Sequence, residues 1–258
     1  MRVKSNAVWH SLSGVVCAYQ SIDAPDPFAA RQNVAHQGAR FGVYTATLGV
    51  LPTWSAATGH AYNGFSQYLK TGIVPSAQKT WTFLLRYSRF SKTAAYQDPL
   101  ASIKTSTGPF FGFEFGPTVD DRIYYENGGY QTKEFTPASA VLTIAGTKSY
   151  RNGTDEGTEI GTTGTTTTLD LYIGAANVNG VSNRYFSGNI AAVAIATRIL
   201  SPAEVWLASR QMAYCEQNPD WNAWARRRMY YYAPPAAAAA FNPAWARNSN
   251  TVINQVHP

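Results

Sequence analysis

Residues 171–214 read LYIGAANVNGVSNRYFSGNIAAVAIATRILSPAEVWLASRQMAY, and this stretch decides the fold. Residues 169–174, which overlap the start of this stretch, alternate between apolar and polar side chains. This pattern predicts a half-buried strand. A hairpin-like turn is expected at residues 177–183. The run at 190–200 is rich in Ile, Val and Ala, so it predicts a well-buried strand.

The sequence SPAE that follows predicts the start of a helix. Ser201 can accept a hydrogen bond from a first-turn amide, and Pro202 occupies a position that needs no amide donor. Glu204 can reach back to complete a capping box, while Leu200 and Val205 fit the hydrophobic contact that flanks such a start. We therefore expect one helix beginning at Ser201.

Two earlier blocks, GHAYNGFSQYL at 59–69 and KTWTFLLR at 79–86, join this ending in an ordered set. Together the blocks resemble laminin G-like domains of the concanavalin A-like lectin and glucanase superfamily, in which the first block is an early hairpin and the second the next strand. Asn63 and Gln67 stand where many members carry acidic residues. The resemblance spans residues 14–214 and implies a jelly-roll sandwich of two curved antiparallel sheets.

Composition agrees with an all-β chain. Sixteen Tyr, twelve Phe and seven Trp among 258 residues favour strands, and twenty Gly and fourteen Pro provide turns. No internal repeat indicates a propeller or solenoid. We expect a two-sheet antiparallel jelly-roll sandwich over residues 1–214 with one short C-terminal helix, followed by an extended C-terminal arm over 215–258.

Targeting and redox signals are weak. The opening MRVKSNAVWHSLSGVV lacks an apolar segment before a small-residue cleavage site, so no secretory signal is predicted. No apolar stretch reaches membrane-spanning length, and we expect no membrane contact. A disulfide between Cys17 and Cys215 is one alternative, but two buried or incidental thiols are favoured in a reducing compartment. Asn152-Gly153 is expected to form a turn.

The net charge of +6 is unevenly distributed. Residues 1–92 hold nine basic and two acidic side chains (+7), residues 93–214 eight and eleven (−3), and the remainder four and two (+2). A cationic face could meet nucleic acid or an acidic protein surface. Because the basic residues of the first part are scattered singly, we favour ordinary solvated positions over nucleic-acid binding.

The sequence gives little indication of a catalytic or metal-binding site. Glycosidases need a pair of carboxylates close enough to act as nucleophile and acid. The acidic cluster DEGTE at 155–159 lies in a Gly/Thr-rich segment, running to Thr168, that we interpret as a hairpin loop. Asp120 and Asp121 are adjacent, so a turn is favoured for them. Calcium could use either group, but neither is a ligand-dense loop.

The histidines are widely spaced, which disfavours a zinc site. No nucleophile elbow, phosphate-binding loop or dinucleotide fingerprint is present. The sequence therefore predicts no enzymatic activity, no metal and no cofactor. The four histidines are His10, His36, His60 and His257.

The segment after Cys215 has a different composition, rich in aromatic residues, Arg, Pro and Ala. A flexible terminus is one interpretation. Aromatic residues and Arg are also enriched in docking hot spots, which favours a docking arm. The predicted partner-docking residues are Trp221, Trp224, Arg226, Arg227, Arg228, Tyr230, Tyr231, Tyr232, Phe241 and Trp245.

The helix LSPAEVWLASRQ, followed by RRR and an Ala-rich, Phe-Asn stretch, also resembles laminin G-like proteins encoded among tailed-bacteriophage and prophage structural genes. This resemblance implies a non-enzymatic virion protein assembled in the host cytoplasm. A capsid decoration or cement role is favoured over a fibre, because no repeats or heptads occur. Its partners would be other virion proteins, the major capsid protein or tail proteins, with homo-oligomeric or symmetric copies in the particle. The alternative is a carbohydrate-binding, lectin-like module of the head or tail that adheres to host-surface glycan.

Overall fold

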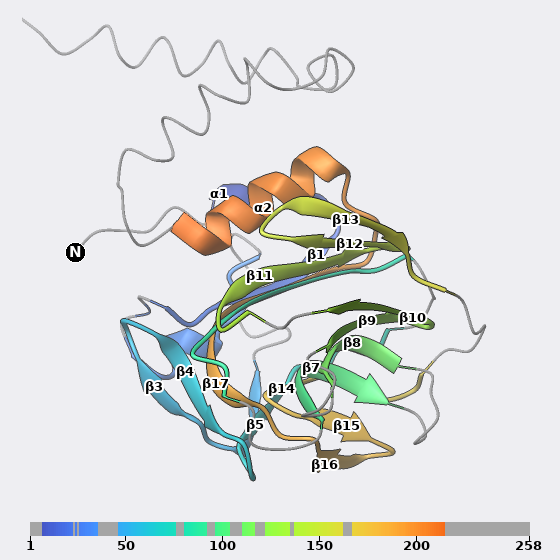
Figure 1. Cartoon of the computed structure of the whole chain (residues 1–258). Helices are drawn as coiled ribbons and strands as arrows, with labels where there is room; N and C mark the ends of the chain where they lie inside the picture. The colour runs from blue at the N-terminus through green and yellow to red at the C-terminus, as the bar shows by residue number, and fades with distance from the viewer. Residues whose placement is uncertain are drawn as a thin grey trace, which may run out of the picture. The chain divides into compact units, whose positions relative to one another are not determined.

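In the computed structural model, the described strands form two sheets that pack face to face (Figure 1). The predicted arm, 215–258, lies outside the described residues, so its boundary and its docking role stay predictions. The structure describes residues 7–22, 24, 26–35, 46–75, 80–91, 96–103, 110–116, 122–134, 137–161 and 167–214.

Sheet A contains eight of the described strands in the order β13-β12-β11-β6-β17-β4-β3, with β1 also beside β17. All of its pairings are antiparallel. Its strands are β1 (Val15–Gln20), β3 (Thr53–Ser55), β4 (Gly59–Asn63), β6 (Thr82–Ser88), β11 (Ala140–Ala145), β12 (Lys148–Arg151), β13 (Thr154–Glu159) and β17 (Ser187–Ala196).

Sheet B contains nine of the described strands in the order β10-β9-β8-β7-β14-β5-β2, with the β15–β16 hairpin attached to β7. Every pairing is antiparallel except that of β15 with β7. Its strands are β2 (Thr47–Val50), β5 (Tyr68–Lys70), β7 (Gln97–Ile103), β8 (Phe110–Phe115), β9 (Arg122–Asn127), β10 (Tyr130–Glu134), β14 (Tyr172–Ile173), β15 (Ala176–Val178) and β16 (Val181–Asn183).

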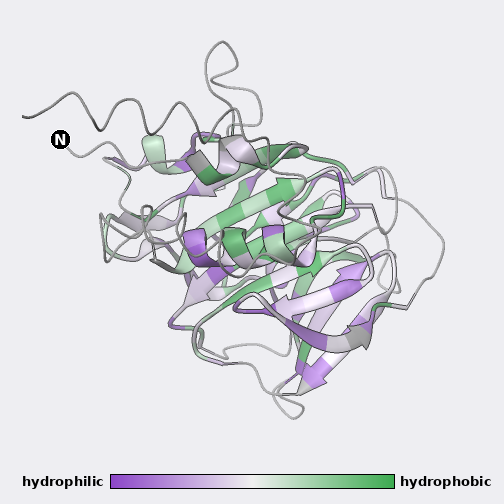
Figure 2. Ribbon diagram, turned by 90° about the horizontal axis from the view of Figure 1, so that it is seen from above, coloured by the Kyte–Doolittle hydropathy of each residue, from purple (hydrophilic) through white to green (hydrophobic). Residues whose placement is uncertain are grey.

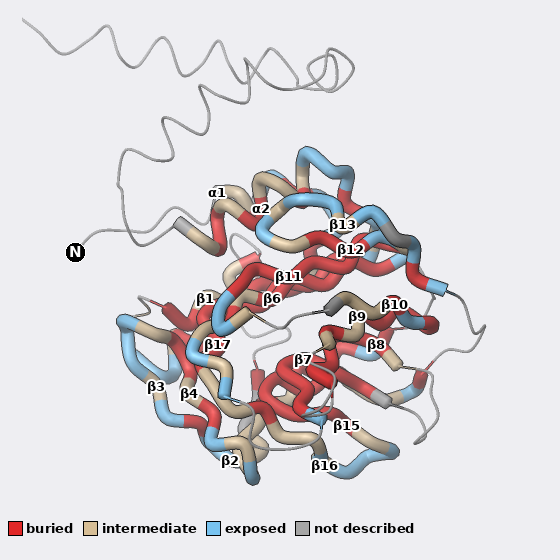
Figure 3. The backbone as a smooth tube through the Cα atoms, viewed as in Figure 1, coloured by how far each residue is buried: buried red, intermediate tan, exposed pale blue. Residues whose placement is uncertain are grey.

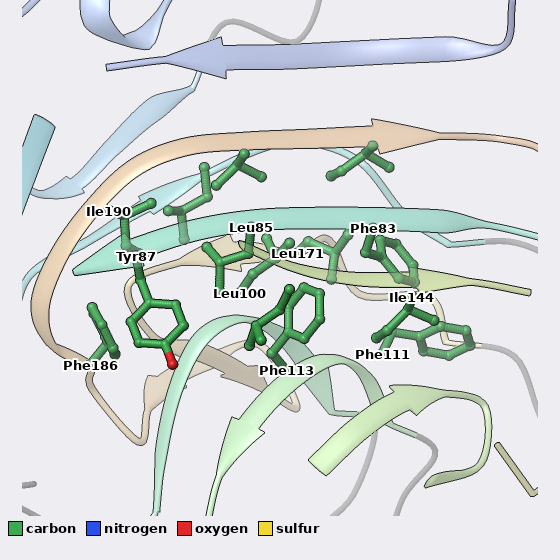
Figure 4. Packing of buried hydrophobic residues seen from close by; sticks show 14 of the residues in the cluster. Phe83, Leu85, Tyr87, Leu100, Phe111, Phe113, Ile144, Leu171, Phe186 and Ile190 are labelled. Atoms are coloured by element: carbon green, nitrogen blue, oxygen red, sulfur yellow. The ribbon is translucent and has the colours of Figure 1, made fainter. Parts of the chain in front are cut away.

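The main core lies between the two sheets (Figure 4). In β8, Phe111, Phe113 and Phe115 alternate along the strand and are buried. They belong to the same cluster as Leu85 and Tyr87 of β6. Burying each such side chain contributes about 1.5–3 kcal/mol, so this aromatic row is a large part of what holds the sheets together.

The outer face of sheet A is covered by two helices, α1 (Ala7–Ser11) and α2 (Pro202–Tyr214). Trp9 lies in one cluster with Leu84 of β6 and Val205 of α2. Figure 2 views the molecule from the helix side and shows hydrophobic residues along the strands beneath. A short 3-10 helix, Ala29–Arg31, completes the helical elements of the described residues.

The predicted helix start is confirmed in detail. The Ser201 amide donates to Glu204 Oε2 at 2.8 Å, and the Glu204 amide donates to Ser201 Oγ at 3.4 Å. These two bonds form the reciprocal capping box. Leu200 and Val205 are both buried in the helix-side cluster, as the flanking hydrophobic contact requires.

The expected hairpin at 59–69 is wrong, because its two strands lie in different sheets. β4 belongs to sheet A and β5 to sheet B. Asn63 Oδ1 accepts hydrogen bonds from the Phe65 and Ser66 amides at 2.9 and 3.1 Å, and Gln67 Oε1 accepts one from the Asn63 amide at 2.9 Å. The amide side chains therefore shape a turn through which the chain crosses between the sheets.

The interpretation of residues 155–159 as a hairpin loop is also wrong. They belong to β13, the edge strand that pairs with β12. The loop is the preceding pair Asn152-Gly153, with φ of 52° and 82° at its two residues. Positive φ at both positions is what a two-residue hairpin needs, and Asn-Gly favours it. The predicted turn is thus present, and it joins strands β12 and β13.

The strands predicted near the C-terminal helix are shorter than expected. Only Tyr172 and Ile173 of residues 169–174 form a strand, and both are buried. Of the run at 190–200, only residues 190–196 belong to a strand, β17, which begins at Ser187 and ends at Ala196. The turn expected at 177–183 is the tip of the β15–β16 hairpin, which Figure 3 shows at the exposed lower edge of the molecule.

Candidate functional site

The outer face of sheet B carries acidic side chains on three neighbouring strands. In β8, the inward row Phe111, Phe113 and Phe115 leaves Glu114 on the opposite face. In β9, inward Ile123 and Tyr125 likewise leave Glu126 on the outer face.

Asp98 joins them from β7, where the register of the ladder with β8 shifts between Gln97 and Leu100. We call Asp98, Glu114 and Glu126 the acidic cluster.

Gly112 of β8 leaves open the space beside Glu126 on the outer face. It pairs with Glu126 on one side and Ala101 of β7 on the other. Its φ is 117°, and an added Cβ would lie 1.9 Å from the Leu100 carbonyl oxygen. This position therefore requires glycine, and no side chain stands between Glu126 and β7.

Arg184 is the counter-charge of the acidic cluster. It follows β16 with a φ of 52°, and its amide donates to Asn183 Oδ1 at 2.8 Å. Its carbonyl accepts the Asp98 amide at 2.8 Å, which ties the loop to β7. The guanidinium donates to Glu114 Oε2, and its Nη1 lies 4.0 Å from Asp98 Oδ2. The loop thus holds one cation against two carboxyl groups.

Aromatic rings surround the guanidinium. Its central carbon lies 4.9 Å from the ring centre of Tyr96 and 5.8 Å from that of Phe110. Such contacts stabilise a cation by about 0.5–1 kcal/mol each at partly exposed sites. The Arg184 side chain is 22% exposed, so this pair of rings helps to fix its direction at the surface of the cluster.

The acidic cluster has more acceptor atoms than donors. Asp98 is 0% exposed, and neither of its carboxyl oxygens has a hydrogen-bond partner among the described residues. Glu126 is 3% exposed, and its Oε2 also lacks a partner within the described part of the chain. Buried polar atoms are nearly always hydrogen-bonded in folded proteins, so three unpartnered oxygens at one place are unusual.

Burial also changes the acidity of these groups. Burial and the charge of Glu114 raise the pKa of Asp98 well above its ordinary value, against the opposing attraction of Arg184. Burial and the charges of Glu114 and Asp98 raise the pKa of Glu126 in the same direction. Burial raises the pKa of Glu114 as well, although the hydrogen-bonded Arg184 lowers it. The cluster therefore holds protons more tightly than isolated carboxyl groups do.

An aromatic pair lies beside the cluster at the edge of sheet B. Tyr130 of β10 stands directly opposite Glu126 in the ladder and is 59% exposed. Its ring centre is 6.1 Å from that of Tyr124, with 47° between the ring planes. This face thus offers exposed aromatic surface beside the buried acidic cluster.

The acidic residues singled out in the sequence do not belong to this cluster where the structure describes them. Glu156 bonds Arg151 at 2.9 Å on sheet A, and Asp155 lies 3.4 Å from Lys148. Asp120 and Asp121 lie outside the described residues. Within the described ranges, no group of three His, Cys, Asp or Glu side chains could hold a metal ion.

The predicted docking residues, Trp221 to Trp245, also lie outside the described residues, as do Cys215, His36 and His257. Cys17 is buried in β1, and burial raises the pKa of its thiol to about 12. None of the helices in the described part of the chain has the length and apolar character needed to cross a membrane.

His60 marks a second polar site inside the core. Its Nδ1 lies 2.9 Å from Ser21 Oγ, while its Nε2 and the hydroxyl of Tyr62 have no partner in the described ranges. Both side chains line a cavity of about 10 Å³. Burial, aided by the charge of Arg31, lowers the pKa of His60 to about 4. A cavity of this size holds about one water molecule.

Sequence reasoning missed the acidic cluster because its members come from separate strands. The alternation FFGFEF at 110–115 does indicate that Glu114 faces away from the phenylalanines. Strand order within a sheet is not visible in that pattern. The sequence therefore indicated the direction of Glu114 but not which carboxyl groups lie near it.

Two packed antiparallel sheets with a helix-covered face and a polar opposite face define a lectin-like sandwich. A family model described as the concanavalin A-like lectin/glucanases superfamily matches residues 63–206, and the chain belongs to this superfamily. A comparison with curated proteins gave no match.

Solved structures show the same fold at low sequence identity. Trypanosoma rangeli sialidase in complex with sialic acid is 13% identical with a TM-score of 0.53, and the match covers 81% of this chain and 35% of the sialidase. A mutant of the same sialidase displaying trans-sialidase activity is also 13% identical, with a TM-score of 0.52. That match covers 80% of this chain and 34% of the mutant sialidase. This chain thus spans about a third of the length of those sialidases.

Proposed function

We propose that the outer face of sheet B binds carbohydrate without cleaving it. The observation that carries this proposal is Tyr130, a 59% exposed ring on the outer face of sheet B whose centre lies 6.1 Å from that of Tyr124. A sugar ring has an apolar face of C–H groups and a rim of hydroxyls. A tyrosine matches both features, because its ring offers rigid apolar contact area and its hydroxyl can form a hydrogen bond with a sugar hydroxyl.

Membership of the lectin/glucanase superfamily supports a carbohydrate ligand, although a fold by itself does not establish function. A binding rather than hydrolytic role is supported by the state of the carboxyl groups. Glu114 is engaged by Arg184, and Asp98 and Glu126 are almost completely buried. A retaining glycosidase needs one free carboxylate nucleophile and one acid flanking the scissile bond.

The test is binding of a polysaccharide panel by the full chain. Tyr130→Ala should lower the affinity for each retained polysaccharide at least tenfold, because it removes the exposed ring. Phe65→Ala is the matched control, since Phe65 is an aromatic residue 72% exposed in the turn between β4 and β5. Equal loss in both variants, or no retained polysaccharide at all, would refute the proposal. Product release that stops in Glu114→Gln would refute the non-enzymatic part.

We further propose that residues 215–258 attach the protein to a bacteriophage particle as a capsid decoration or cement protein. The support is the composition of that segment, with three consecutive arginines at 226–228 and its many aromatic residues. The described sandwich ends with α2 at Tyr214, so the proposal places attachment after the core.

Deleting 216–258 should leave cooperative unfolding intact and abolish incorporation into particles that lack this protein. Undiminished incorporation of the truncated chain would refute attachment through the arm. Loss of folding would show that the segment belongs to the core.

A further inference from the structure

We propose that Asn179 is a site of spontaneous deamidation, at which the side-chain amide is converted to a carboxylic acid without an enzyme. This inference is independent of the proposed carbohydrate binding. The reaction favours an asparagine followed by a glycine, because glycine has no side chain to obstruct its backbone nitrogen. The sequence contains four such pairs, at 63–64, 127–128, 152–153 and 179–180. The structure distinguishes the last pair from the other three.

The reaction is a ring closure within the chain. Hydroxide removes the proton from the Gly180 backbone nitrogen, which then forms a bond to Cγ of Asn179. The side-chain nitrogen leaves that carbon as ammonia after taking a proton from water, and a cyclic imide remains. Water then opens the imide on either side of its nitrogen, so the net change consumes one water and releases one ammonia. The side chain of the asparagine must therefore be able to turn its Cγ toward the glycine nitrogen.

Two of the other asparagine side chains are held by several hydrogen bonds or by burial. Asn63 Oδ1 accepts the Phe65 and Ser66 amides at 2.9 and 3.1 Å, and its Nδ2 donates to Ser66 Oγ at 3.3 Å. Asn127 is 0% exposed, and its Nδ2 donates to the Gly146 carbonyl at 2.9 Å. These bonds must break before either Cγ can reach the next nitrogen, which costs free energy and slows the ring closure.

Asn152 is the closest structural counterpart of Asn179, because both open a two-residue hairpin turn, with φ of 52° and 51°. Asn152 differs in that its Oδ1 accepts the Val141 amide at 2.9 Å, which ties the side chain to β11. A Cβ added at Gly153 would lie 3.3 Å from Trp206 Cα of α2, so this turn also packs closely against the helix. The third pair is therefore held on two sides.

Asn179 has none of these restraints among the described residues. It lies at the exposed tip of the β15–β16 hairpin (Figure 3), and no described residue bonds its carboxamide. A Cβ added at Gly180 would meet no atom within 4 Å. The Gly180 amide donates to Asn177 Oδ1 at 2.9 Å, but the amides of Gly64 and Gly128 also donate, to main-chain carbonyls at 3.0 and 2.9 Å. Freedom of the asparagine side chain is thus what distinguishes this pair.

The two products differ in their effect on the hairpin. Aspartate followed by glycine also fits a turn with positive φ at both positions, so this product adds a negative charge and keeps the turn. Isoaspartate, formed when the imide opens on its other side, adds a carbon to the main chain and breaks the pairing of Val178 with Val181 that closes the turn. Arg184 follows β16 directly, so the isoaspartate form should hold this guanidinium less firmly.

Peptide mapping of the full chain measures conversion at each pair. The folded protein is incubated at pH 8.5 and 37 °C, digested in acid, and analysed by liquid chromatography and mass spectrometry, which separate the aspartate and isoaspartate peptides. A second sample is incubated in guanidinium chloride. We expect conversion at Asn179 at least tenfold faster than at the other three in the folded protein. All four should convert at similar rates in the unfolded chain, where no contact restrains the side chains.

Two variants assign the change to one residue. Asn179→Gly should abolish the acidic form that ion-exchange chromatography separates from the folded protein, because Gly-Gly also fits the turn. Asn152→Gly, at the same position of the β12–β13 hairpin, should leave conversion at Asn179 unchanged. Thermal unfolding confirms that each variant is folded. If Asn179→Gly fails to fold, peptide mapping of the wild type decides the result.

Conversion of Asn63, Asn127 or Asn152 in the folded protein at a rate within tenfold of that of Asn179 would overturn the assignment. Absence of conversion at Asn179 during the time in which the unfolded chain converts completely would also overturn it, and would show that the bond from the Gly180 amide protects the pair. The separated isoaspartate form should unfold at a lower urea concentration than the unmodified protein. An equal midpoint would refute the effect on the hairpin.

Discussion

Arg184 Nη1 lies 4.0 Å from Asp98 Oδ2. At this distance the guanidinium charge acts on the buried carboxyl group, but the two groups are too far apart for a hydrogen bond. The same guanidinium bonds Glu114, and the backbone of the two residues is joined by the bond from the Asp98 amide to the Arg184 carbonyl. Asp98 is therefore held in place by the main chain while its side chain stays unsatisfied. Stability should therefore depend on this imbalance.

Asp98→Asn should remove a pH dependence of stability. The folded-state pKa of Asp98 is raised, so the folded protein holds a proton that the unfolded chain releases near pH 4. The contribution of Asp98 to the free energy of unfolding is thus fully present below about pH 4 and is lost as pH rises toward the folded pKa. Urea unfolding from pH 4 to 8 should show wild type losing stability relative to Asp98→Asn. Parallel curves would contradict this.

Arg184→Met should destabilise the fold by about 3 kcal/mol, because removal of one partner leaves buried carboxyl groups without a cation. Lys148→Met is the control, since Lys148 forms a half-exposed ion pair with Asp155 at 3.4 Å. That change should cost about 0.5 kcal/mol or less. Denaturant unfolding at pH 7 measures both. Equal effects would show that the Arg184 contacts are no stronger than a surface ion pair.

Ser201→Ala should lower the free energy of unfolding by about 1 kcal/mol. The variant loses the Ser201 Oγ acceptor for the Glu204 amide but keeps the backbone bond to Glu204 Oε2. The remaining bond should keep α2 in place, so glycan binding on sheet B is expected to be unchanged. Chemical unfolding gives the stability change, and no change would mean that water replaces the cap without cost.

His60→Gln should remove an acid-dependent loss of stability. Burial keeps His60 neutral in the folded state with a pKa of about 4, whereas the unfolded side chain protonates near pH 6.5. The contribution of His60 is present above about pH 6.5 and is lost as pH falls toward 4, at up to about 1.4 kcal/mol per pH unit. Unfolding curves of wild type and variant across this range should converge at low pH. An unchanged difference would contradict the assigned protonation.

The sequence specified local structure better than the assembly of the sheets. The capping box at Ser201 and the Asn152-Gly153 turn depend on neighbouring residues, and both are present. The turn also implied strands on either side, which the Gly/Thr-rich composition after it obscured. Residues 59–69 were misassigned as a hairpin because two short strands joined by a turn look alike whether they pair or cross between sheets.

The acidic cluster could not be predicted from the sequence, for a related reason. Glu114 and Glu126 become neighbours through the ladder that pairs Gly112 with Glu126, and Asp98 enters through an irregularity in β7. Arg184 reaches them because β15 runs parallel to β7, the single parallel pairing of the described strands. None of these relationships leaves a fixed spacing in the chain. The strand face on which a glutamate lies could be predicted from the alternation of side chains. That these residues lie close together could not, because it depends on the order of the strands in the sheet.

The central claim is that the outer face of sheet B binds carbohydrate, and the most direct measurement compares Tyr130→Ala with Phe65→Ala in calorimetric titrations of one retained oligosaccharide with the full-length protein. The account predicts that Tyr130→Ala weakens binding at least tenfold while Phe65→Ala binds as wild type does. Wild-type affinity in Tyr130→Ala, with the fold intact by thermal unfolding, would contradict the claim.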